Sequence, residues 1–491
     1  MNEVPNLAGS LRGKGLRREQ PLCLDRRFLL FTLLAALLLS WPLLVFGRPA
    51  YIQDSAAYYK GGRAAVSFAL GKLDRSEAAT KGAQAGQEAD LPAPHAETAK
   101  DVSGVRSITY SVAAYLLSAP GVTLALLTIA QALATGALMV AALGAFGGLP
   151  AGRMMAALIV LAGATTAAPV AIFAVPDIFA GLLIGSMVLL TAAPSRVSAG
   201  ARLLCAGIAT FAVTAHASHI PLAGGMTMLG LGCITVARFS GTPLPRWTWA
   251  WVVAPLLIGG LTLLSINRVA FGETSLASKR YPFALARSVD DGPGRWYLEK
   301  HCPELRYTIC TLYPHGLPQG GALEFLWGKD GVVQRATPAQ LDRIREEEPE
   351  IVLAAAREYS GHEFRRLTYN AAVQLIIFQP YPFIERLVLD DTGTPQLSPA
   401  PQANEKVLGI IGVLTAISAA IGTLCLGWIF LRKRPLRPVI TLMFLGILGN
   451  AATCVLLAAV AHRYQARVIW LIPLFALALL GSLRGGVHRL D

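Results

Sequence analysis

Charged residues are scarce in this chain. Asp, Glu, Lys and Arg make up only 15% of its 491 residues, whereas 54% are hydrophobic. A typical soluble domain carries about 25% charged residues, so this composition excludes a soluble enzyme and indicates a membrane protein. Internal repeats and a glycine-rich nucleotide-binding pattern are also missing from the sequence, which removes the support for repeat proteins and dinucleotide-binding folds.

The sequence contains many long apolar runs. A helix that crosses a bilayer needs about 20 mainly apolar residues, and ten runs approach that length: 28–46, 121–147, 154–168, 177–192, 202–214, 222–236, 247–266, 407–431, 439–461 and 468–483. The fifth and sixth are short and share a break at Pro221. The sequence therefore predicts an all-α polytopic membrane protein of about ten transmembrane helices, with outer-face loop helices and a small extracytoplasmic domain. The first run lacks a small-residue cleavage site, so we expect it to be retained.

Lys and Arg set the expected orientation, because cytoplasmic loops retain them. They precede the first run and fill alternate connections, at Arg12, Lys14, Arg17, Arg18, Arg26, Arg27, Arg153, Arg196, Arg202, Arg238, Arg246, Arg432, Lys433, Arg434, Arg437, Arg484 and Arg489. This pattern predicts a multi-pass membrane protein with both termini cytoplasmic. We expect the membrane to be a bacterial inner membrane, with the site facing the periplasm. The net charge of +13 then reflects topology. We reject nucleic-acid binding, which would need the charge on one soluble face.

Two outer segments divide the chain into four parts. These are a basic cytoplasmic N-terminus (1–27), a transmembrane module (28–266) with a first outer loop (48–120), an extracytoplasmic domain (267–405), and C-terminal transmembrane helices with a cytoplasmic tail (406–491). Within the first outer loop, apolar spacing predicts a helix over 54–73 and a surface helix that begins near Arg106. Residues 76–101 between them have almost no large apolar side chain and are expected to be a mobile insertion.

The extracytoplasmic domain has two predicted helices and a predicted disulfide. Thr337 and Pro338 have the pattern of an N-cap followed by proline at the first helical position, and a second apolar stripe follows Gly361. That stripe either packs on the preceding helix or rests on the membrane surface. Cys302 and Cys310 are the only two of seven cysteines in the predicted outer region. In an oxidising compartment we expect them to form a disulfide, with two free thiols as the alternative.

Several ionisable residues fall at the outer ends of the apolar runs, where topology alone would not place them. Asp54 follows the first run, and Asp177 opens the fourth. Arg463 and Arg467 occupy the short link before the last run. Such residues indicate a functional site by default, and arginines suit a phosphate. The structural alternatives are a solvated loop carboxylate for Asp54, a helix-opening role for Asp177, and contact with lipid headgroups for the arginines.

Two histidines, His216 and His219, lie in the outer turn between the fifth and sixth runs. They could line a polar site, bind a metal or be ordinary turn residues, and without a third ligand a zinc site has weak support. All the unusual residues share the outer face: Asp54, Arg106, Tyr110, Asp177, His216, His219, Lys279, Arg280, Arg463 and Arg467. This predicts a polar cavity at the outer membrane surface. The middles of the runs are nearly bare of charge, which argues against a transporter.

These features resemble the polytopic glycosyltransferases of the GT-C fold, the group that includes protein O-mannosyltransferases and the aminoarabinose transferases of lipid A. The resemblance covers most of the chain in architecture. It rests on four short stretches, namely Gln53-Asp54-Ser55-Ala56-Ala57-Tyr58-Tyr59, Arg106-Ser107-Ile108-Thr109-Tyr110-Ser111, Pro176-Asp177-Ile178-Phe179-Ala180, and Arg463-Tyr464 followed by Pro473.

The resemblance implies transfer of a sugar, with inversion, from a polyprenyl-phosphate donor to a glycan, lipid or protein acceptor at the outer face of the membrane. Asp54 would be the general base. The donor phosphate would be bound by Arg463, Arg467, Arg280 and His219, and the site would be lined by Tyr58, Arg106, Tyr110, Asp177, His216 and Tyr464. Many relatives have a second acidic residue where this chain has Ser55, so a divalent metal is not supported and no cofactor is assigned.

Two other functions stay open at this stage. A lipid-linked oligosaccharide polymerase or ligase also uses outer-face arginines, but it would not need an acidic base after the first span. A flippase or transporter would move the lipid-linked sugar without making a glycosidic bond. A membrane scaffold would leave the two arginines of the last outer link unexplained.

Overall fold

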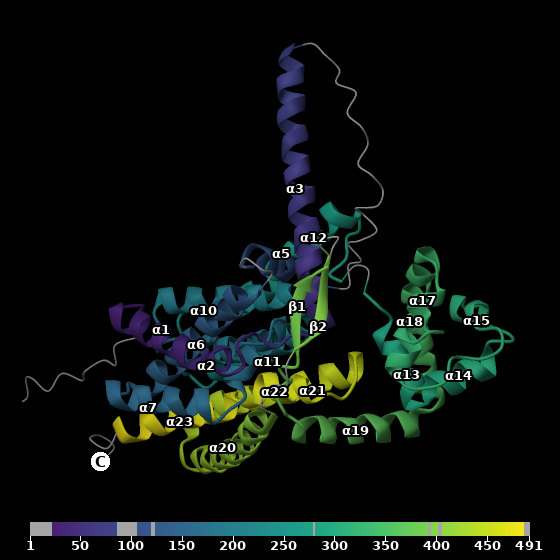
Figure 1. The fold of residues 1–491 in the computed structure, drawn as a ribbon. Helices are drawn as coiled ribbons and strands as arrows, with labels where there is room; N and C mark the ends of the chain where they lie inside the picture. Colours follow the sequence, from purple (N-terminus) through teal and green to yellow (C-terminus); the bar gives the residue numbers. More distant parts are fainter. Residues whose placement is uncertain are drawn as a thin grey trace, which may run out of the picture.

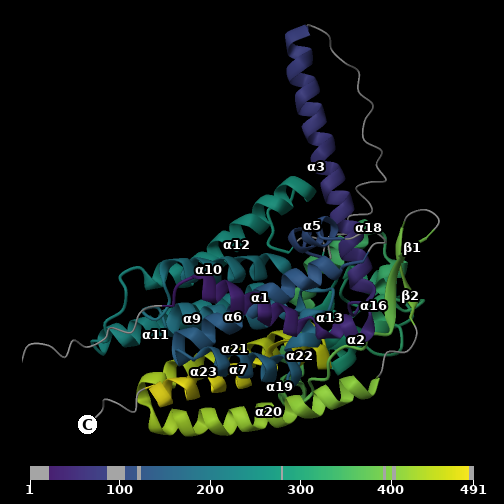
Figure 2. The ribbon, with the colours of Figure 1, turned by 60° about the vertical axis from the view of Figure 1, so that its left-hand side comes forward.

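The computed structural model describes residues 22–85, 106–118, 123–277, 280–390, 394–400 and 405–485. A helical bundle forms one part of the molecule, and a group of shorter helices stands beside one end of it (Figures 1 and 2). The bundle contains α1 (Arg26–Leu39), α2 (Trp41–Phe46), α6 (Ala125–Gly147), α7 (Ala151–Gly163), α8 (Ala167–Ala171), η2 (Pro176–Ile178), α9 (Phe179–Ala192), α10 (Ala199–Ala215), α11 (His219–Phe239), α12 (Thr248–Phe271), α20 (Glu405–Arg432), η3 (Arg434–Leu436), α21 (Arg437–Leu457), α22 (His462–Ile469) and α23 (Leu471–Gly485).

Seven helices in the described part of the chain are long and apolar enough to cross a membrane. They are Arg26–Phe46, Ala125–Phe146, His219–Phe239, Thr248–Phe271, Lys406–Arg432, Arg434–Leu457 and His462–Leu483. The third, fourth and fifth predicted runs form the shorter apolar helices Ala151–Gly163, Pro176–Ala192 and Ala199–Ala215. The prediction that the sixth run is short and broken at Pro221 is wrong. The helix is 21 residues long, Pro221 lies inside its first turn, and the break falls at His216, whose backbone is extended.

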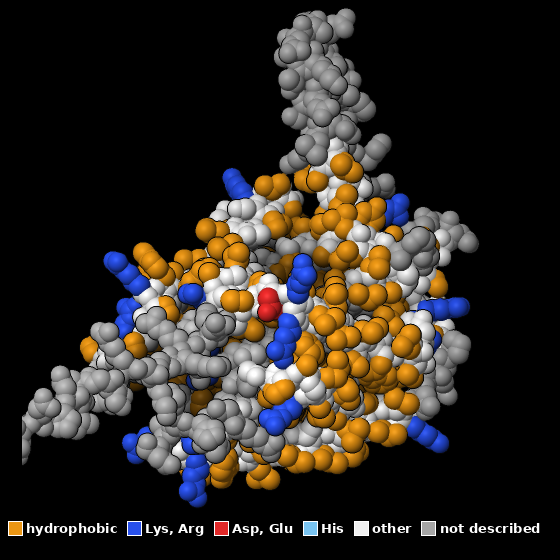
Figure 3. All heavy atoms as spheres, turned by 90° about the vertical axis from the view of Figure 1, so that its left-hand side faces the viewer, with side chains coloured by type: hydrophobic (Ala, Val, Ile, Leu, Met, Phe, Trp, Pro, Cys, Tyr) orange, Lys and Arg blue, Asp and Glu red, His pale blue; other side chains and the backbone are white. Residues whose placement is uncertain are grey.

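Basic residues gather at one end of the bundle. The N-terminal segment contacts two links at this end, because Arg27 donates a hydrogen bond to the Leu149 carbonyl at 2.8 Å and Leu22 pairs with Val197. Figure 3 shows the face on the left of Figure 1, where blue Lys and Arg side chains stand out and red acidic groups are scarce. This arrangement is the one that the positive-inside rule requires of a cytoplasmic face.

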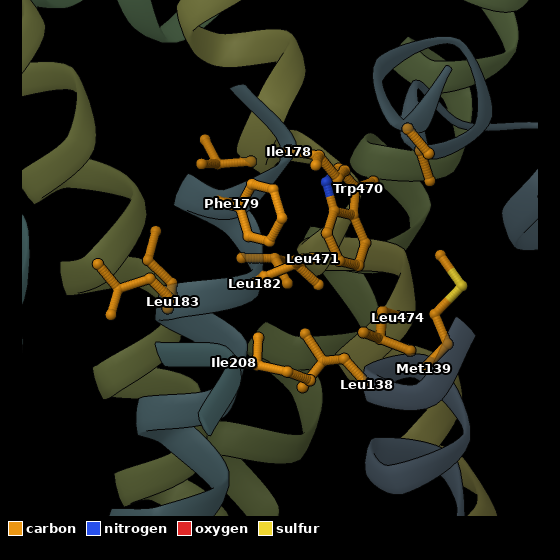
Figure 4. Packing of buried hydrophobic residues seen from close by; sticks show 14 of the residues in the cluster. Leu138, Met139, Ile178, Phe179, Leu182, Leu183, Ile208, Trp470, Leu471 and Leu474 are labelled. Carbon is orange, nitrogen blue, oxygen red and sulfur yellow. The ribbon is translucent and has the colours of Figure 1, made fainter. Parts of the chain in front are cut away.

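A tightly packed core holds the C-terminal helices against α9. Phe179 and Leu182 of α9 lie close to Trp470 and Leu471 (Figure 4). A methyl group added at Gly181 would stand 2.6 Å from the Arg467 carbonyl oxygen and 2.8 Å from the Trp470 ring. The close approach of α9 to this backbone therefore requires glycine at position 181, because any side chain there would collide with it. This contact fixes α22, which carries both Arg463 and Arg467.

The helices outside the bundle start from its opposite end. They are α3 (Gln53–Ala85), α5 (Ile108–Leu116), α13 (Phe283–Asp291), α14 (Pro293–His301), α15 (Thr308–Leu312), α16 (Ala322–Trp327), α17 (Val332–Arg335), α18 (Pro338–Glu358) and α19 (Ser360–Ile376), with an antiparallel hairpin of β1 (Glu385–Leu389) and β2 (Pro395–Pro399). α3 is longer than predicted, so the first residues of the expected mobile insertion, up to Ala85, are helical. The rest of that insertion lies outside the described residues.

The predicted extracytoplasmic domain has a hydrophobic cluster of its own. Leu285, Leu298, Phe325, Ile344 and Ile351 are among its buried members. The predicted start of α18 is confirmed, because Thr337 caps the helix in a capping box with Gln340 and proline follows at the first position. A disulfide joins Cys302, at the C-terminal end of α14, to Cys310 in the middle of α15, with their Cα atoms 5.3 Å apart.

Candidate functional site

A cavity of 1740 Å³ lies between the end of the bundle opposite the basic face and the helices outside the bundle. It is lined from the bundle side by the start of α3, the approach to α5, the α10–α11 link, the ends of α12 and α21, and the start of α22. From the other side it is lined by α13, α16, α18 and α19. Seven of the residues predicted for the site line it, namely Asp54, Tyr58, Arg106, His216, Arg280, Arg463 and Tyr464.

The start of α3 is held in place by the backbone before it. Gly47 ends α2 with a φ of +68°, a conformation that glycine adopts without strain. Ala50 then pairs with the strand-like segment before η2, donating to the Ile172 carbonyl and accepting from the Ala174 N–H, each at 3.0 Å. Because two hydrogen bonds fix Ala50, the first turn of α3 begins at the edge of the bundle and carries Asp54 to the cavity wall.

Asp54 is the centre of a charged cluster at this wall. Its Oδ1 pairs with the Arg106 guanidinium, and its Oδ2 lies 4.0 Å from Nη1 of Arg463. The Asp54 side chain is 32% exposed and that of Arg463 is 25% exposed. Burial opposes ionisation of this carboxyl, but the neighbouring Arg106 and Arg463 guanidinium groups outweigh it and hold the pKa of Asp54 below its ordinary value. The carboxylate is therefore ionised at neutral pH.

Tyr464 connects the two arginines of the last outer link. The guanidinium carbon of Arg463 is 4.9 Å from the centre of its ring, and that of Arg467 is 5.2 Å away. Arg463 also donates a hydrogen bond to the Tyr464 hydroxyl at 3.2 Å. An aromatic ring attracts a nearby cation through its quadrupole, so Tyr464 helps to fix the direction in which Arg463 points.

Arg467 is not part of the cavity wall. Its side chain is 1% exposed and forms an ion pair with the buried Asp177 at 3.2 Å. Asn450 Oδ1 accepts from Arg467 Nε at 3.0 Å and Nη2 at 2.8 Å. Asn450 also donates to the Tyr464 carbonyl at 2.7 Å. The sequence grouped Arg467 with Arg463 as phosphate ligands and Asp177 with the site lining, but the structure places this pair beneath the wall. There the opposite charges of Arg467 and Asp177 Oδ1 compensate each other, while the buried Asp177 Oδ2 has no hydrogen-bond partner among the described residues.

The two histidines also lie at different depths. His216 lines the cavity, whereas His219 is fully buried and its Nδ1 donates to the Ala212 carbonyl at 2.7 Å. Nδ1 of His216 accepts the Ser218 N–H at 3.2 Å, so the ring proton sits on Nε2. Burial, with a further contribution from Arg467 and Arg463, lowers the pKa of His216 to about 3. His216 is therefore a neutral ring at pH 7.

Two tyrosines lie against each other near Asp54, and only one of them reaches the cavity. Tyr58 lines the cavity, and its ring centre lies 4.8 Å from that of Tyr110. Tyr110 is fully buried and donates to Gln131 Oε1 at 2.9 Å. Tyr110 thus supports Tyr58 from below and does not reach the cavity, although the sequence predicted it as a lining residue.

Arg280 lies on the opposite wall and has a partner that the sequence analysis missed. It pairs with Glu348 at 2.5 Å, and Glu348 also accepts the Leu285 N–H at 3.0 Å. Burial raises the pKa of Glu348 in spite of these contacts. Helical phase could have identified this residue, because Glu348 shares the buried face of α18 with Ile344 and Ile351.

Metal binding receives no support from the described residues, among which no group of three or more His, Cys, Asp or Glu side chains could hold an ion. The chain's class, as far as the structure defines it, is that of a multi-pass helical membrane protein. Comparison with known proteins finds no matching family, no matching curated protein and no matching solved structure. The functional argument therefore rests on the cavity itself.

Proposed function

We propose that this protein is an inverting glycosyltransferase with a GT-C-like fold, which moves a sugar from a polyprenyl-phosphate donor to an acceptor at the outer surface of the membrane. The observation that carries this proposal is the meeting of one carboxylate, Asp54, and two guanidinium groups, Arg106 and Arg463, at the wall of one large cavity. The cavity lies at the end of the bundle opposite to the basic face, which would be periplasmic in an inner membrane with both termini in the cytoplasm.

The chemistry needs a base on one side of the sugar and a cation on the other. The acceptor hydroxyl attacks the anomeric carbon while its proton passes to Asp54, and the bond from that carbon to the phosphate oxygen breaks with its electron pair. Asp54 Oδ1 is engaged by Arg106, whereas Oδ2 is 4.0 Å from Arg463 and so beyond hydrogen-bond distance. Oδ2 is therefore the oxygen that we assign to the acceptor proton.

The leaving phosphate gains negative charge as the bond breaks. Arg463 is the cation best placed to bind it, because its guanidinium fork suits phosphate and Tyr464 fixes its direction. Arg280 would contribute only if the phosphate or the acceptor reached the opposite wall, since Glu348 already pairs with it. We assign Arg467 and His219 to the support of this wall and not to phosphate binding. Such preformed charge is what stabilises a transition state effectively.

The lining of the cavity suits a lipid-linked donor. Leu263, Ile266 and Phe271 of α12 and Leu456 and Leu457 of α21 line it together with the charged residues. Both helices are long enough to cross a membrane. A polyprenyl chain could therefore remain in the hydrocarbon while its phosphate reached Arg463. Counting the three shorter apolar helices with the seven long ones gives the ten spans that we propose for the intact membrane domain.

The direct test is an assay of the purified protein in lipid vesicles with a panel of polyprenyl-phosphate sugars and with lipid, glycan and peptide acceptors. We expect one donor to yield a new glycosidic bond of inverted anomeric configuration, together with free polyprenyl phosphate. Growth of one glycan by repeated units would indicate a polymerase or ligase. Movement of the donor across the bilayer with no new bond would indicate a flippase and contradict the proposal.

A further inference from the structure

We propose that Tyr381 and Glu385 bind the sugar of the donor, in a subsite between the proposed base and the proposed phosphate ligand. This inference rests on the proposed function, which leaves the sugar without a protein contact. Tyr381 lies in the segment between α19 and β1, residues 377–384, which we call the strap, and Glu385 is the first residue of β1. Both residues line the cavity.

The strap is anchored to the bundle on both sides of its tyrosine. Before the tyrosine, the Gln379 N–H donates a hydrogen bond to Nδ1 of His462 at 3.3 Å. After it, the Phe383 ring stacks on Phe46 with the ring centres 4.2 Å apart, and Arg48 donates to the Phe383 carbonyl at 2.5 Å. The middle of the strap therefore has a fixed position at the cavity wall.

Proline flanks the tyrosine on both sides, at Pro380 and Pro382. A proline ring fixes its own φ and pushes the residue before it into an extended conformation. Gln379 and Tyr381 each precede a proline, so both are held extended. A ligand that binds the strap then loses little affinity to the ordering of its backbone.

The Tyr381 ring has a rigid support. It stacks on Phe173, with the ring centres 5.0 Å apart and the planes 8° from parallel. Phe173 is only 1% exposed, and its carbonyl accepts a hydrogen bond from Gln131 at 2.8 Å. The stack therefore fixes the Tyr381 ring between Phe173 and the cavity.

Tyr381 and Glu385 lie near both parts of the charged cluster. The stacking partner of Tyr381 stands between two residues whose backbones pair with Ala50, four positions before Asp54. The strap is also bonded to the residue that precedes Arg463. The hairpin that Glu385 begins lies beside α3, the helix that carries Asp54 (Figures 1 and 2). Direct displacement needs the sugar in this place, between the base and the phosphate.

The subsite suits a neutral ligand with many hydroxyl groups. The Tyr381 hydroxyl has no hydrogen-bond partner among the described residues, and neither has Oε2 of Glu385. Burial raises the pKa of Tyr381, and the Glu385 carboxyl raises it further, so the phenol keeps its proton at neutral pH. A phenol donates and accepts hydrogen bonds and a carboxylate accepts them, which matches sugar hydroxyls. The carboxyl groups of Asp54 and Glu385 near this phenol disfavour a phosphate here.

The test compares probes with and without a sugar, bound to the full chain in lipid vesicles. The probes are undecaprenyl monophosphate and undecaprenyl phosphates that carry glucose, mannose or aminoarabinose. Tyr381→Phe keeps the stacked ring and removes only the hydroxyl, and Glu385→Gln keeps the shape of the side chain and removes its charge. Tyr369→Phe is the matched control, because Tyr369 on α19 is 61% exposed and is not part of the cavity wall.

We expect the parent to bind at least one sugar-bearing probe more tightly than the monophosphate. Tyr381→Phe and Glu385→Gln should each weaken binding of that probe by about 2–10-fold, the effect of one hydrogen bond, and leave binding of the monophosphate unchanged. Tyr369→Phe should bind every probe as the parent does. If one variant unfolds more readily than the parent, the other decides the outcome.

Three results would overturn the subsite. They are a parent with no preference for any sugar-bearing probe, variants that bind these probes as the parent does, and variants that weaken the monophosphate equally. The proposed function fails in a different way, because a protein with the expected binding pattern that forms no glycosidic bond would keep the subsite and lose the transferase assignment.

Discussion

Arg463 and Arg467 stand one helical turn apart on α22, and each lies beside an aspartate, yet the two pairs are in different environments. Arg463 and Asp54 are partly exposed at the cavity wall and 4.0 Å apart. Arg467 and Asp177 are buried and 3.2 Å apart, and Asn450 accepts two further hydrogen bonds from Arg467. The comparison teaches that a loosely held pair beside a cavity is available to a substrate. A tightly held pair in the interior is committed to the fold.

The largest expected effect is on catalysis at the exposed pair. Replacing Asp54 with Asn keeps the shape of the side chain but removes the proton acceptor, and general-base catalysis typically contributes about 10²–10⁴-fold in rate. We expect a loss of that size in transfer by the purified protein, with little change in its unfolding midpoint. Asp54→Asn with the activity of the parent would remove Asp54 from the mechanism and favour the polymerase or ligase alternative.

The next effect is on stability at the buried pair. Asp177→Asn leaves the Arg467 charge without its counter-ion in the interior, which costs about 3–5 kcal/mol. Denaturant unfolding in detergent should show this loss. Replacing both residues, as in Asp177→Asn with Arg467→Met, should recover part of it, because no uncompensated charge then stays buried. Unchanged stability of Asp177→Asn would mean that water reaches this pair and that the contrast with Asp54 is false.

A smaller loss of transfer rate is expected when the proposed phosphate ligand, Arg463, is replaced. Arg463→Gln removes the cation, and the loss of one preorganised donor to a developing oxyanion costs on the order of 100-fold in rate. Arg463→Lys retains the charge but not the planar fork, so its activity should lie between those of the parent and Arg463→Gln. Binding of the donor, followed by fluorescence, should weaken in the same order. Equal rates for all three proteins would exclude Arg463 as the phosphate ligand.

The smallest effect is the pH dependence of stability that Asp54 contributes. Its pKa is lowered in the folded protein, so the stabilisation is present above the pKa of the unfolded chain and is lost as pH falls through the folded value. Because the pair is partly exposed, we expect less than about 1 kcal/mol. The difference in unfolding free energy between the parent and Asp54→Asn should therefore shrink as the solution is acidified below pH 4. A difference that grows on acidification would contradict the direction of the shift.

Seven of the ten predicted runs form helices that are long and apolar enough to cross a membrane. These could be predicted because a long apolar run is a local property of the sequence. The cap at Thr337 is equally local, since one side chain and the next residue define it. The helical part of the predicted insertion was missed because a scarcity of large apolar residues was taken as disorder. Ala, Gln, Glu and Lys nevertheless favour a helix by intrinsic propensity.

The sequence could not predict which of the candidate side chains face the cavity and which are buried behind its wall. The predicted topology puts both members of each pair, Arg463 with Arg467 and His216 with His219, at the same end of the bundle. The local sequence does not indicate which member of each pair faces the cavity. That choice depends on packing against distant residues, such as the approach of α9 to α22 at Gly181. The interaction of Arg280 with Glu348, 68 positions away, is set by tertiary structure in the same way.

The most direct test of the account is a structure of the protein with a non-hydrolysable polyprenyl-phosphonate sugar. We expect the phosphonate to lie within hydrogen-bond distance of Arg463, with the anomeric carbon facing Asp54 Oδ2 and Arg467 still bound to Asp177. A phosphonate held away from Arg463, or a sugar that leaves no path from its anomeric carbon to Asp54, would contradict the account.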